Sequence, residues 1–177
     1  MTSTVLDPEH HAKLIANLHT YAADAAIDPY WVETSLKTLP ISDELLTWLK
    51  ASPKAVRDHD TKGLVIVGHK KTSDLCSAIA GLFLRNYLRA RVVTAIQLAD
   101  GSPDYWREPT VVIVPNLQAG GASLAPWQAL TAQDALMQRA LANKMTIIAI
   151  SDLNDFKDST LRPVAEFVEH NYDVVSF

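Results

Sequence analysis

The sequence is poor in the features that mark secreted, membrane-bound and metal-binding proteins. Cys76 is the one cysteine among 177 residues, so the chain cannot form an internal disulfide or a cysteine-based metal site. No apolar stretch is long enough to span a bilayer, and the N-terminus lacks the basic flank and apolar run of a signal peptide. We therefore expect a cytoplasmic protein without membrane association, in which Cys76 is a small buried side chain.

Positive charge is also scarce. The chain has 16 Lys and Arg residues against 20 Asp and Glu residues, which gives a net charge of -4. The composition therefore shows no basic surface dedicated to nucleic acid. A hydrophobic fraction of 48% and a charged fraction of 20% are typical of a globular protein, and 177 residues are enough to bury one substantial core.

The two parts of the sequence show different patterns. Residues 1–60 contain helix-start signals at Asp7-Pro8, Asp28-Pro29 and Ser42, which predict a helical N-terminal extension. From residue 61 to residue 177, apolar runs alternate with helical segments, and this alternation predicts an α/β core with a parallel sheet. The expected strands are residues 64–67, 91–96, 111–114, 146–150 and 172–175, and the main expected helices are residues 73–90, 127–143 and 161–170.

The turn after the first expected strand has the setting of a P-loop, GxxxxGK[ST]. On that template Gly68 is the first glycine, Ser73 takes the second glycine position, Asp74 the lysine position and Leu75 the hydroxyl position. Ser73 is then expected to cap the following helix, with Asp74 in its first turn. A carboxylate in place of the lysine would repel a triphosphate, since a unit charge pair at about 4 Å contributes roughly 4 kcal/mol at an effective dielectric of about 20. Leu75 has no oxygen atom for magnesium.

Two lysines in the same loop keep nucleotide binding open as an alternative. Lys70 and Lys71 follow Gly68 closely, and either one could reach a phosphate from an unusual position. The candidate nucleotide-binding residues are therefore Gly68, Lys70, Lys71 and Ser73. We expect ATP binding to be absent or very weak, and we assign no cofactor, no catalytic residue and no metal ligand.

The element order from residue 45 to residue 177 resembles the AAA+ ATPase core of bacterial helicase loaders and transposition helper ATPases of the DnaC and IstB type. Residues 62–68 are similar to the strand that leads into the family's P-loop, and residues 97–100 to the segment after its second strand. The resemblance implies a RecA-like, five-stranded parallel sheet, sandwiched by helices, in the order 5-1-4-3-2. It also implies two acidic residues at the end of the Walker B strand, where this sequence has Pro115 and Asn116.

The loss of both nucleotide motifs predicts a pseudo-ATPase. Such a protein would be a non-catalytic AAA+-like interaction protein in DNA replication or mobile-element biology, and it would bind a replicative helicase, an initiator or a related AAA+ ATPase. The resemblance leaves a homo-oligomer open. One alternative is an active ATPase that uses Lys70 or Lys71. The other is a nucleic-acid-binding accessory protein with a basic patch at Arg85, Arg89 and Arg91.

Two further expectations concern the ends of this core. The sensor strand of the resembling family ends in a small polar residue and asparagine, and here it ends in Ser151 and Asp152. Capping and turn roles are predicted for Asp152, Asp155 and Asp158. The N-terminal helices carry Trp31 and Trp48. We expect these helices to contact a partner, because helical appendages do so in the resembling loaders.

Overall fold

The computed structural model describes residues 5–68, 72–100, 103–117 and 124–176. The N-terminal part contains α1 (Ala12–Ala16), α2 (Leu18–Asp24), α3 (Pro29–Glu33), the 3-10 helix η1 (Leu36–Thr38) and α4 (Asp43–Arg57). The rest contains β1 (Gly63–Val67), α5 (Thr72–Arg85), β2 (Ala90–Val92), α6 (Ala95–Asp100), α7 (Pro103–Trp106), β3 (Val111–Val114), α9 (Pro126–Leu141), β4 (Met145–Ile150), α10 (Leu153–Lys157), α11 (Arg162–Asn171) and β5 (Tyr172–Ser176).

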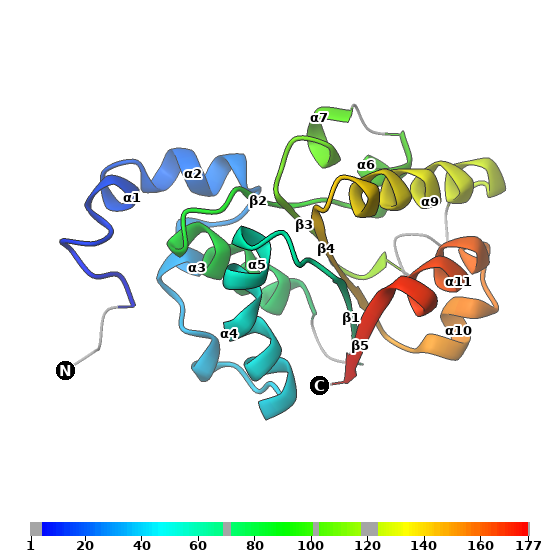
Figure 1. The fold of residues 1–177 in the computed structure, drawn as a ribbon, viewed down its shortest axis with the longest axis horizontal. Helices are drawn as coiled ribbons and strands as arrows, with labels where there is room; N and C mark the ends of the chain where they lie inside the picture. Colours follow the sequence, from blue (N-terminus) through cyan, green and yellow to red (C-terminus); the bar gives the residue numbers. More distant parts are fainter. Residues whose placement is uncertain (1–4, 69–71, 101–102, 118–123, 177) are drawn as a thin grey trace.

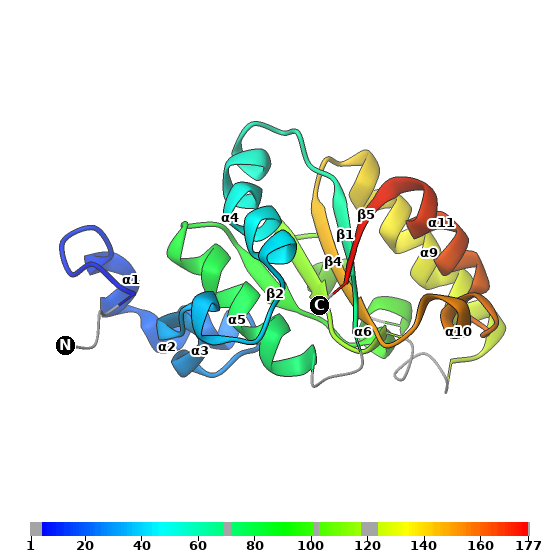
Figure 2. The same cartoon turned by 90° about the horizontal axis from the view of Figure 1, so that it is seen from below.

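The strands form one parallel sheet in the order β2-β3-β4-β1-β5, as predicted (Figure 1). In the sheet, Leu64 of β1 lies beside Ile147 of β4 on one side and Asp173 of β5 on the other. β1 is therefore an internal strand, in agreement with its continuous apolar run. Helices cover both faces of the sheet, with α4 and α5 on one side and α9 and α11 on the other (Figure 2).

The core consists of two apolar layers separated by the sheet. Val65 and Ile148 belong to the layer under α6, α9 and α11, whereas Leu64 and Ile147 belong to the layer under α4 and α5. This alternation follows from the period of two along a strand. Cys76 of α5 is buried in the second layer, as predicted, and burial raises the pKa of its thiol to about 12.

The second strand is shorter than predicted. The expected strand at residues 91–96 is wrong beyond Val92, because residues 95–100 form helix α6 instead. Thr94 explains this, since its Oγ1 accepts a hydrogen bond from the Gln97 N–H at 3.2 Å while the Gln97 side chain accepts one from the Thr94 N–H at 2.9 Å. This reciprocal capping box starts a helix directly after the strand.

The predicted helix starts in the N-terminal part are confirmed at two places. The Asp28 carboxylate accepts a hydrogen bond from the Tyr30 N–H at 2.8 Å, and the Ser42 hydroxyl accepts one from the Leu45 N–H at 3.2 Å. Asp7 also accepts hydrogen bonds, from the N–H groups of Glu9 and His10, but these stabilise a turn before α1.

Helices α3 and α4 pack against the same core as the sheet, whereas the buried residues of α1 and α2 belong to a separate apolar cluster. Trp31 and Trp48 are partly buried against the layer under α4 and α5, and the Trp48 Nε1–H donates a hydrogen bond to Asp173 at 3.0 Å. Helix α3 approaches α5 so closely that a Cβ atom at Gly81 would lie 2.1 Å from the Trp31 carbonyl oxygen. Both tryptophans therefore have a structural role within the chain.

Candidate functional site

The candidate site lies at the carboxyl ends of β1, β3 and β4, where parallel α/β sheets bind their ligands. Gly68 directly follows β1, and its N–H donates a hydrogen bond to the Ile150 carbonyl at the end of β4, 3.0 Å away. Pro115 and Asn116 follow β3. Asn116 has a φ of 47°, a left-handed conformation that asparagine adopts more readily than most residues.

A hydrogen bond between side chains joins the start of α5 to the segment after β3 at this edge of the sheet. Thr72, the first residue of α5, is only 1% exposed, and its hydroxyl donates to the Asn116 side-chain oxygen at 2.5 Å. These residues are far apart in the sequence, with a separation of 44. The bond fixes the start of α5 against the loop that follows β3.

The placement of Thr72 corrects the template alignment of the loop. Leu75, which the template placed at the magnesium-binding position, is buried in the core under α4 and α5. α5 begins at Thr72, so Ser73 lies inside the first turn of the helix, and the prediction that it caps the helix is wrong. Asp74 lies in the first turn, as predicted, and both Ser73 and Asp74 are exposed.

The loop is shorter than the P-loop template requires. Only residues 69–71 separate Gly68 from Thr72, whereas the whole run xxxxGK separates the first glycine from the hydroxyl in the template. The order Lys71-Thr72 reproduces the last two positions, K[ST], and this is the signal that a fixed template length missed. Lys70 and Lys71 lie outside the described residues, so their roles stay predictions.

The described part of this edge does not fit a magnesium–nucleotide complex of the usual kind. In P-loop NTPases the metal is held by the loop hydroxyl and a Walker B aspartate. Thr72 supplies such a hydroxyl here, but it faces a neutral amide, Asn116. Among the residues that the structure describes, no group of three or more His, Cys, Asp or Glu side chains could hold a metal ion.

The acidic residue after β4 has a capping role, as predicted. The Asp152 carboxylate accepts hydrogen bonds from the N–H groups of Asn154 at 2.8 Å and Asp155 at 3.0 Å, at the start of α10. These bonds satisfy backbone donors that the helix leaves without an internal partner. Asp152 therefore stabilises the helix end beside the candidate site.

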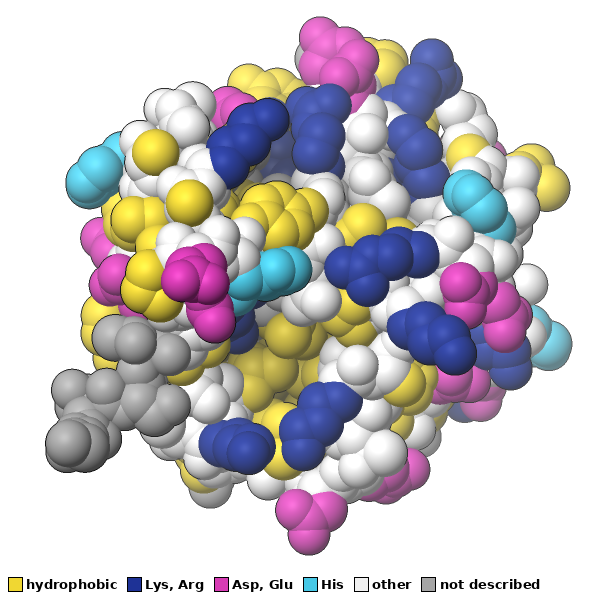
Figure 3. All heavy atoms as spheres, turned by 60° about the vertical axis from the view of Figure 1, so that its left-hand side comes forward, with side chains coloured by type: hydrophobic (Ala, Val, Ile, Leu, Met, Phe, Trp, Pro, Cys, Tyr) yellow, Lys and Arg dark blue, Asp and Glu magenta, His cyan; other side chains and the backbone are white. Residues whose placement is uncertain are grey.

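The basic patch that the sequence left open as an alternative does not include Arg85. Arg85 is buried, where its guanidinium donates a hydrogen bond to the Val32 carbonyl at 2.6 Å, and burial lowers its pKa to about 10. The Arg89 guanidinium forms an ion pair with the Glu108 carboxylate at 3.4 Å (Nη1 to Oε2). The Arg91 guanidinium lies 4.5 Å from the centre of the Tyr105 ring. On the side of the molecule that lies to the left in Figure 1, Lys and Arg side chains are spread over the surface, with hydrophobic side chains between them (Figure 3).

Comparison with known proteins gives matches in structure but not in sequence. No protein-family model matches the sequence, and no curated protein matches it either. DnaA from Aquifex aeolicus bound to AMPPCP aligns with a TM-score of 0.63 at 11% identity, over 81% of this chain and 49% of that chain. Replication initiator DnaA bound to AMPPCP and single-stranded DNA aligns with a TM-score of 0.64 at 11% identity, over 85% and 50%. DnaI aligns with a TM-score of 0.62 at 14% identity, over 85% and 94%.

These similarities define the fold class. The chain shares the fold of these DnaA and DnaI structures, and its five-stranded parallel sheet flanked by helices agrees with the predicted fold class. It spans about half the length of the DnaA chains and nearly all of the DnaI chain. Within the described ranges, no helix has the length and apolar character needed to cross a membrane.

Proposed function

We propose that this protein is a non-catalytic AAA+-like interaction protein of DNA replication or mobile-element biology. Its partner would be a replicative helicase, an initiator or a related ATPase. The observation that carries the proposal is the Thr72–Asn116 hydrogen bond, which joins the two places where a P-loop NTPase holds magnesium. A neutral amide stands where the metal-binding carboxylate is required.

The chemistry of this pair supports a site without phosphoryl transfer. Magnesium in such sites is bound through carboxylates, substrate phosphates and water, and Asn116 contributes no negative charge. Pro115 has no carboxylate either, so neither residue can activate an attacking water molecule as a base. The residues that follow β3 therefore lack both a metal-binding acid and a general base.

The structural neighbours support the biological setting. DnaA is a replication initiator, and the structures compared include DnaA bound to AMPPCP and to single-stranded DNA. Extending a role in replication to this chain is part of the proposal, since the likeness itself concerns the fold.

Binding to the replicative helicase of the native host tests this function. The full-length protein should co-elute with the purified helicase in size-exclusion chromatography, in the absence of ATP and in its presence. The matched control is Thr72→Val, which removes the hydroxyl but leaves the outer surface unchanged, and it should co-elute to the same extent. A complex that forms only with ATP, or no complex with helicase, initiator or related ATPase from that host, would contradict the proposal.

A second candidate, nucleotide binding through the shortened loop, is favoured by one observation. Thr72 begins α5 opposite the loop after β3, and Lys71 precedes it, as in the K[ST] dipeptide of a P-loop. Calorimetric titration with ATP and magnesium separates the two candidates. The first predicts no binding at tens of micromolar ATP, whereas the second predicts a low-micromolar isotherm that disappears in Lys71→Ala.

A further inference from the structure

Helix α9 has apolar residues on two faces, and only one of them is covered. Its inner face packs into the core through Ala129, Ala132 and Leu136. Its outer face carries four large hydrophobic side chains that are exposed to solvent: Trp127 at 61%, Leu130 at 53%, Met137 at 40% and Leu141 at 82%. Contiguous exposed apolar surface on a globular protein is often a site of protein interaction.

The exposed residues are spaced for contact with another helix. Together with Asp134 they form what we call the α9 seam: Trp127, Leu130, Asp134, Met137 and Leu141. The intervals alternate between three and four residues, which is the a/d spacing of a heptad repeat. At 100° per residue, the seam occupies about 80° of the helix circumference. Such a narrow stripe fits one partner helix that runs along α9.

Hydrogen bonds within the chain fix both ends of α9, and with them the seam. At the N-terminus of α9, the Gln128 side chain accepts a hydrogen bond from the Ala125 N–H at 2.7 Å and donates one to Asp100 at 2.7 Å. Near the C-terminus, the buried Arg139 guanidinium donates to the Thr146 hydroxyl at 2.8 Å and to the Pro109 carbonyl at 3.0 Å. A surface that is already ordered loses less conformational entropy when a partner binds.

Charge distinguishes a foreign partner from a second copy of the chain. Asp134 lies in the middle of the seam and is exposed. Pairing of α9 with α9 of a second copy, in either orientation, would bring the two Asp134 carboxylates close together at the centre of the contact, and like charges in such a contact are unfavourable. A partner helix that carries Lys or Arg at this central position would gain an ion pair instead.

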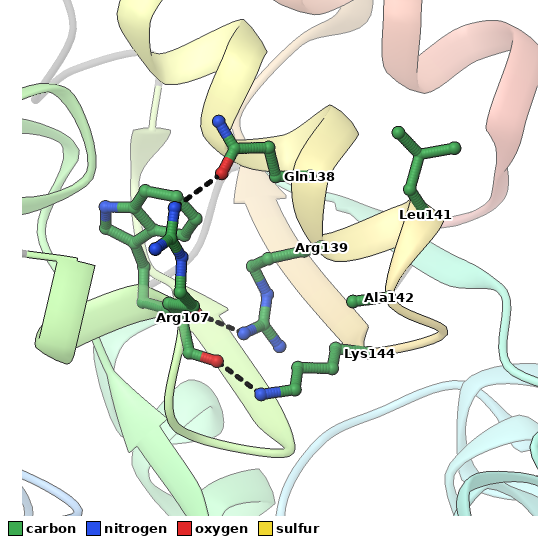
Figure 4. A pocket seen from close by; sticks show the side chains of 7 residues that line it. Arg107, Gln138, Arg139, Leu141, Ala142 and Lys144 are labelled. Atoms are coloured by element: carbon green, nitrogen blue, oxygen red, sulfur yellow. Dashed lines mark hydrogen bonds between the residues drawn. The ribbon is translucent and has the colours of Figure 1, made fainter.

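The C-terminal end of the seam has the opposite charge. A cavity of about 490 Å³ opens there, and its walls include Leu141, Arg107 and Lys144 (Figure 4). Arg107 donates a hydrogen bond to Gln138 at 2.9 Å, and Lys144 donates to the backbone oxygens of residues 107 and 108. These acceptors are neutral, so both cations can attract an acidic residue.

We propose that the α9 seam docks an amphipathic helix of a partner protein. That helix has apolar residues at heptad spacing, a Lys or Arg opposite Asp134, and an Asp or Glu near Arg107 and Lys144. This proposal extends the proposed function. It rests on that function in one respect, namely that the partner is a protein. It does not require the partner to be a helicase.

The probe is a fluorescein-labelled synthetic helical peptide of about three heptads. It has leucine at the seam positions, lysine at the central one and glutamate at one end, and a matched peptide carries glutamate at the centre. Fluorescence anisotropy with the full-length protein should show at least tenfold tighter binding of the lysine peptide. Asp134→Lys should reverse this preference, and the double variant L130S/M137S should weaken binding at least tenfold. Ile15→Ser, which changes an exposed apolar residue on α1, is the control and should bind like the wild type.

The remaining outcomes would overturn the proposal. These are the absence of binding to both peptides, an unchanged preference in Asp134→Lys, or equal loss in Ile15→Ser. Sedimentation equilibrium identifies the other occupant, because a dimer that dissociates in L130S/M137S would assign the seam to a second copy. If the peptides fail but the protein still co-elutes with the host helicase, the proposed function stands and the seam proposal alone is wrong.

Discussion

The carboxyl edge of the sheet and the outer face of α9 differ in how their side chains are satisfied. At the sheet edge, Thr72 and Asn116 bond to each other and Gly68 bonds to the end of β4, so the polar groups are used within the chain. On α9, the apolar side chains of Leu130 and Leu141 are mostly exposed to solvent. A ligand that used these described polar groups would have to break their contacts within the chain, whereas a partner on α9 would remove apolar surface from water.

Removal of the Arg139 guanidinium, which anchors α9, should have the largest effect on the free energy of unfolding. Arg139→Met leaves several buried oxygen atoms without a donor, among them the carbonyls of Pro109 and Thr110 and the Thr146 hydroxyl. The free energy of unfolding should fall by about 3–5 kcal/mol, measured by urea denaturation. The matched control, Arg89→Met, removes an exposed ion pair with Glu108 and should change it by less than about 1 kcal/mol. Equal effects would show that α9 does not depend on the buried network.

Gly81→Ala should have the second-largest effect on the free energy of unfolding. The new Cβ atom would lie 2.1 Å from the Trp31 carbonyl oxygen, so α3 and α5 must move apart. We expect a loss of about 1–3 kcal/mol in the free energy of unfolding, although alanine favours a helix over glycine by about 1 kcal/mol. Ser77→Ala on the same helix is the control and should be close to neutral. A Gly81→Ala protein that is more stable than the wild type would refute the close contact between α3 and α5.

The pair at the sheet edge should show a coupling of intermediate size. Thr72→Val and Asn116→Ala each remove one partner of the same hydrogen bond. A double-mutant cycle, evaluated from chemical denaturation, should give a coupling energy of about 1 kcal/mol. Thr131→Val, which alters an exposed hydroxyl bonded to the Trp127 carbonyl, serves as the control. A coupling energy of zero would mean that the two side chains do not depend on each other.

The smallest change in stability is expected on the α9 seam itself. L130S/M137S alters exposed side chains, so the free energy of unfolding should stay within about 0.5 kcal/mol of the wild-type value. Thermal unfolding followed by circular dichroism measures this. A large destabilisation would mean that the seam contributes to the core, and the loss of peptide binding could then no longer be assigned to the surface.

The sheet could be predicted from the sequence because buried parallel strands appear as continuous apolar runs. Leu64 to Val67 and Val111 to Val114 are such runs, and the order of the five strands followed from the family resemblance. The end of the second strand was missed because the Thr94–Gln97 capping box lies inside an apolar stretch.

The candidate site was predicted in part, and the α9 seam was not. The polar substitutions after β3 are visible in the sequence, but the Thr72–Asn116 bond joins distant residues and appears only in the fold. Fixed template spacing led to Leu75 instead of Thr72. For α9, the sequence predicted a helix, but apolar residues on both faces do not reveal which face the core covers.

Phosphate release from ATP shows whether the edge of the sheet is catalytic. It should be measured with magnesium, for the full-length protein alone and together with an ATPase-inactive form of the host helicase. We predict no release above the background of the inactive helicase, both for the wild type and for Asn116→Asp, because a single carboxylate cannot serve both as magnesium ligand and as general base. Release by the wild type that is abolished in Lys71→Ala would contradict the account and establish an ATPase with a shortened loop.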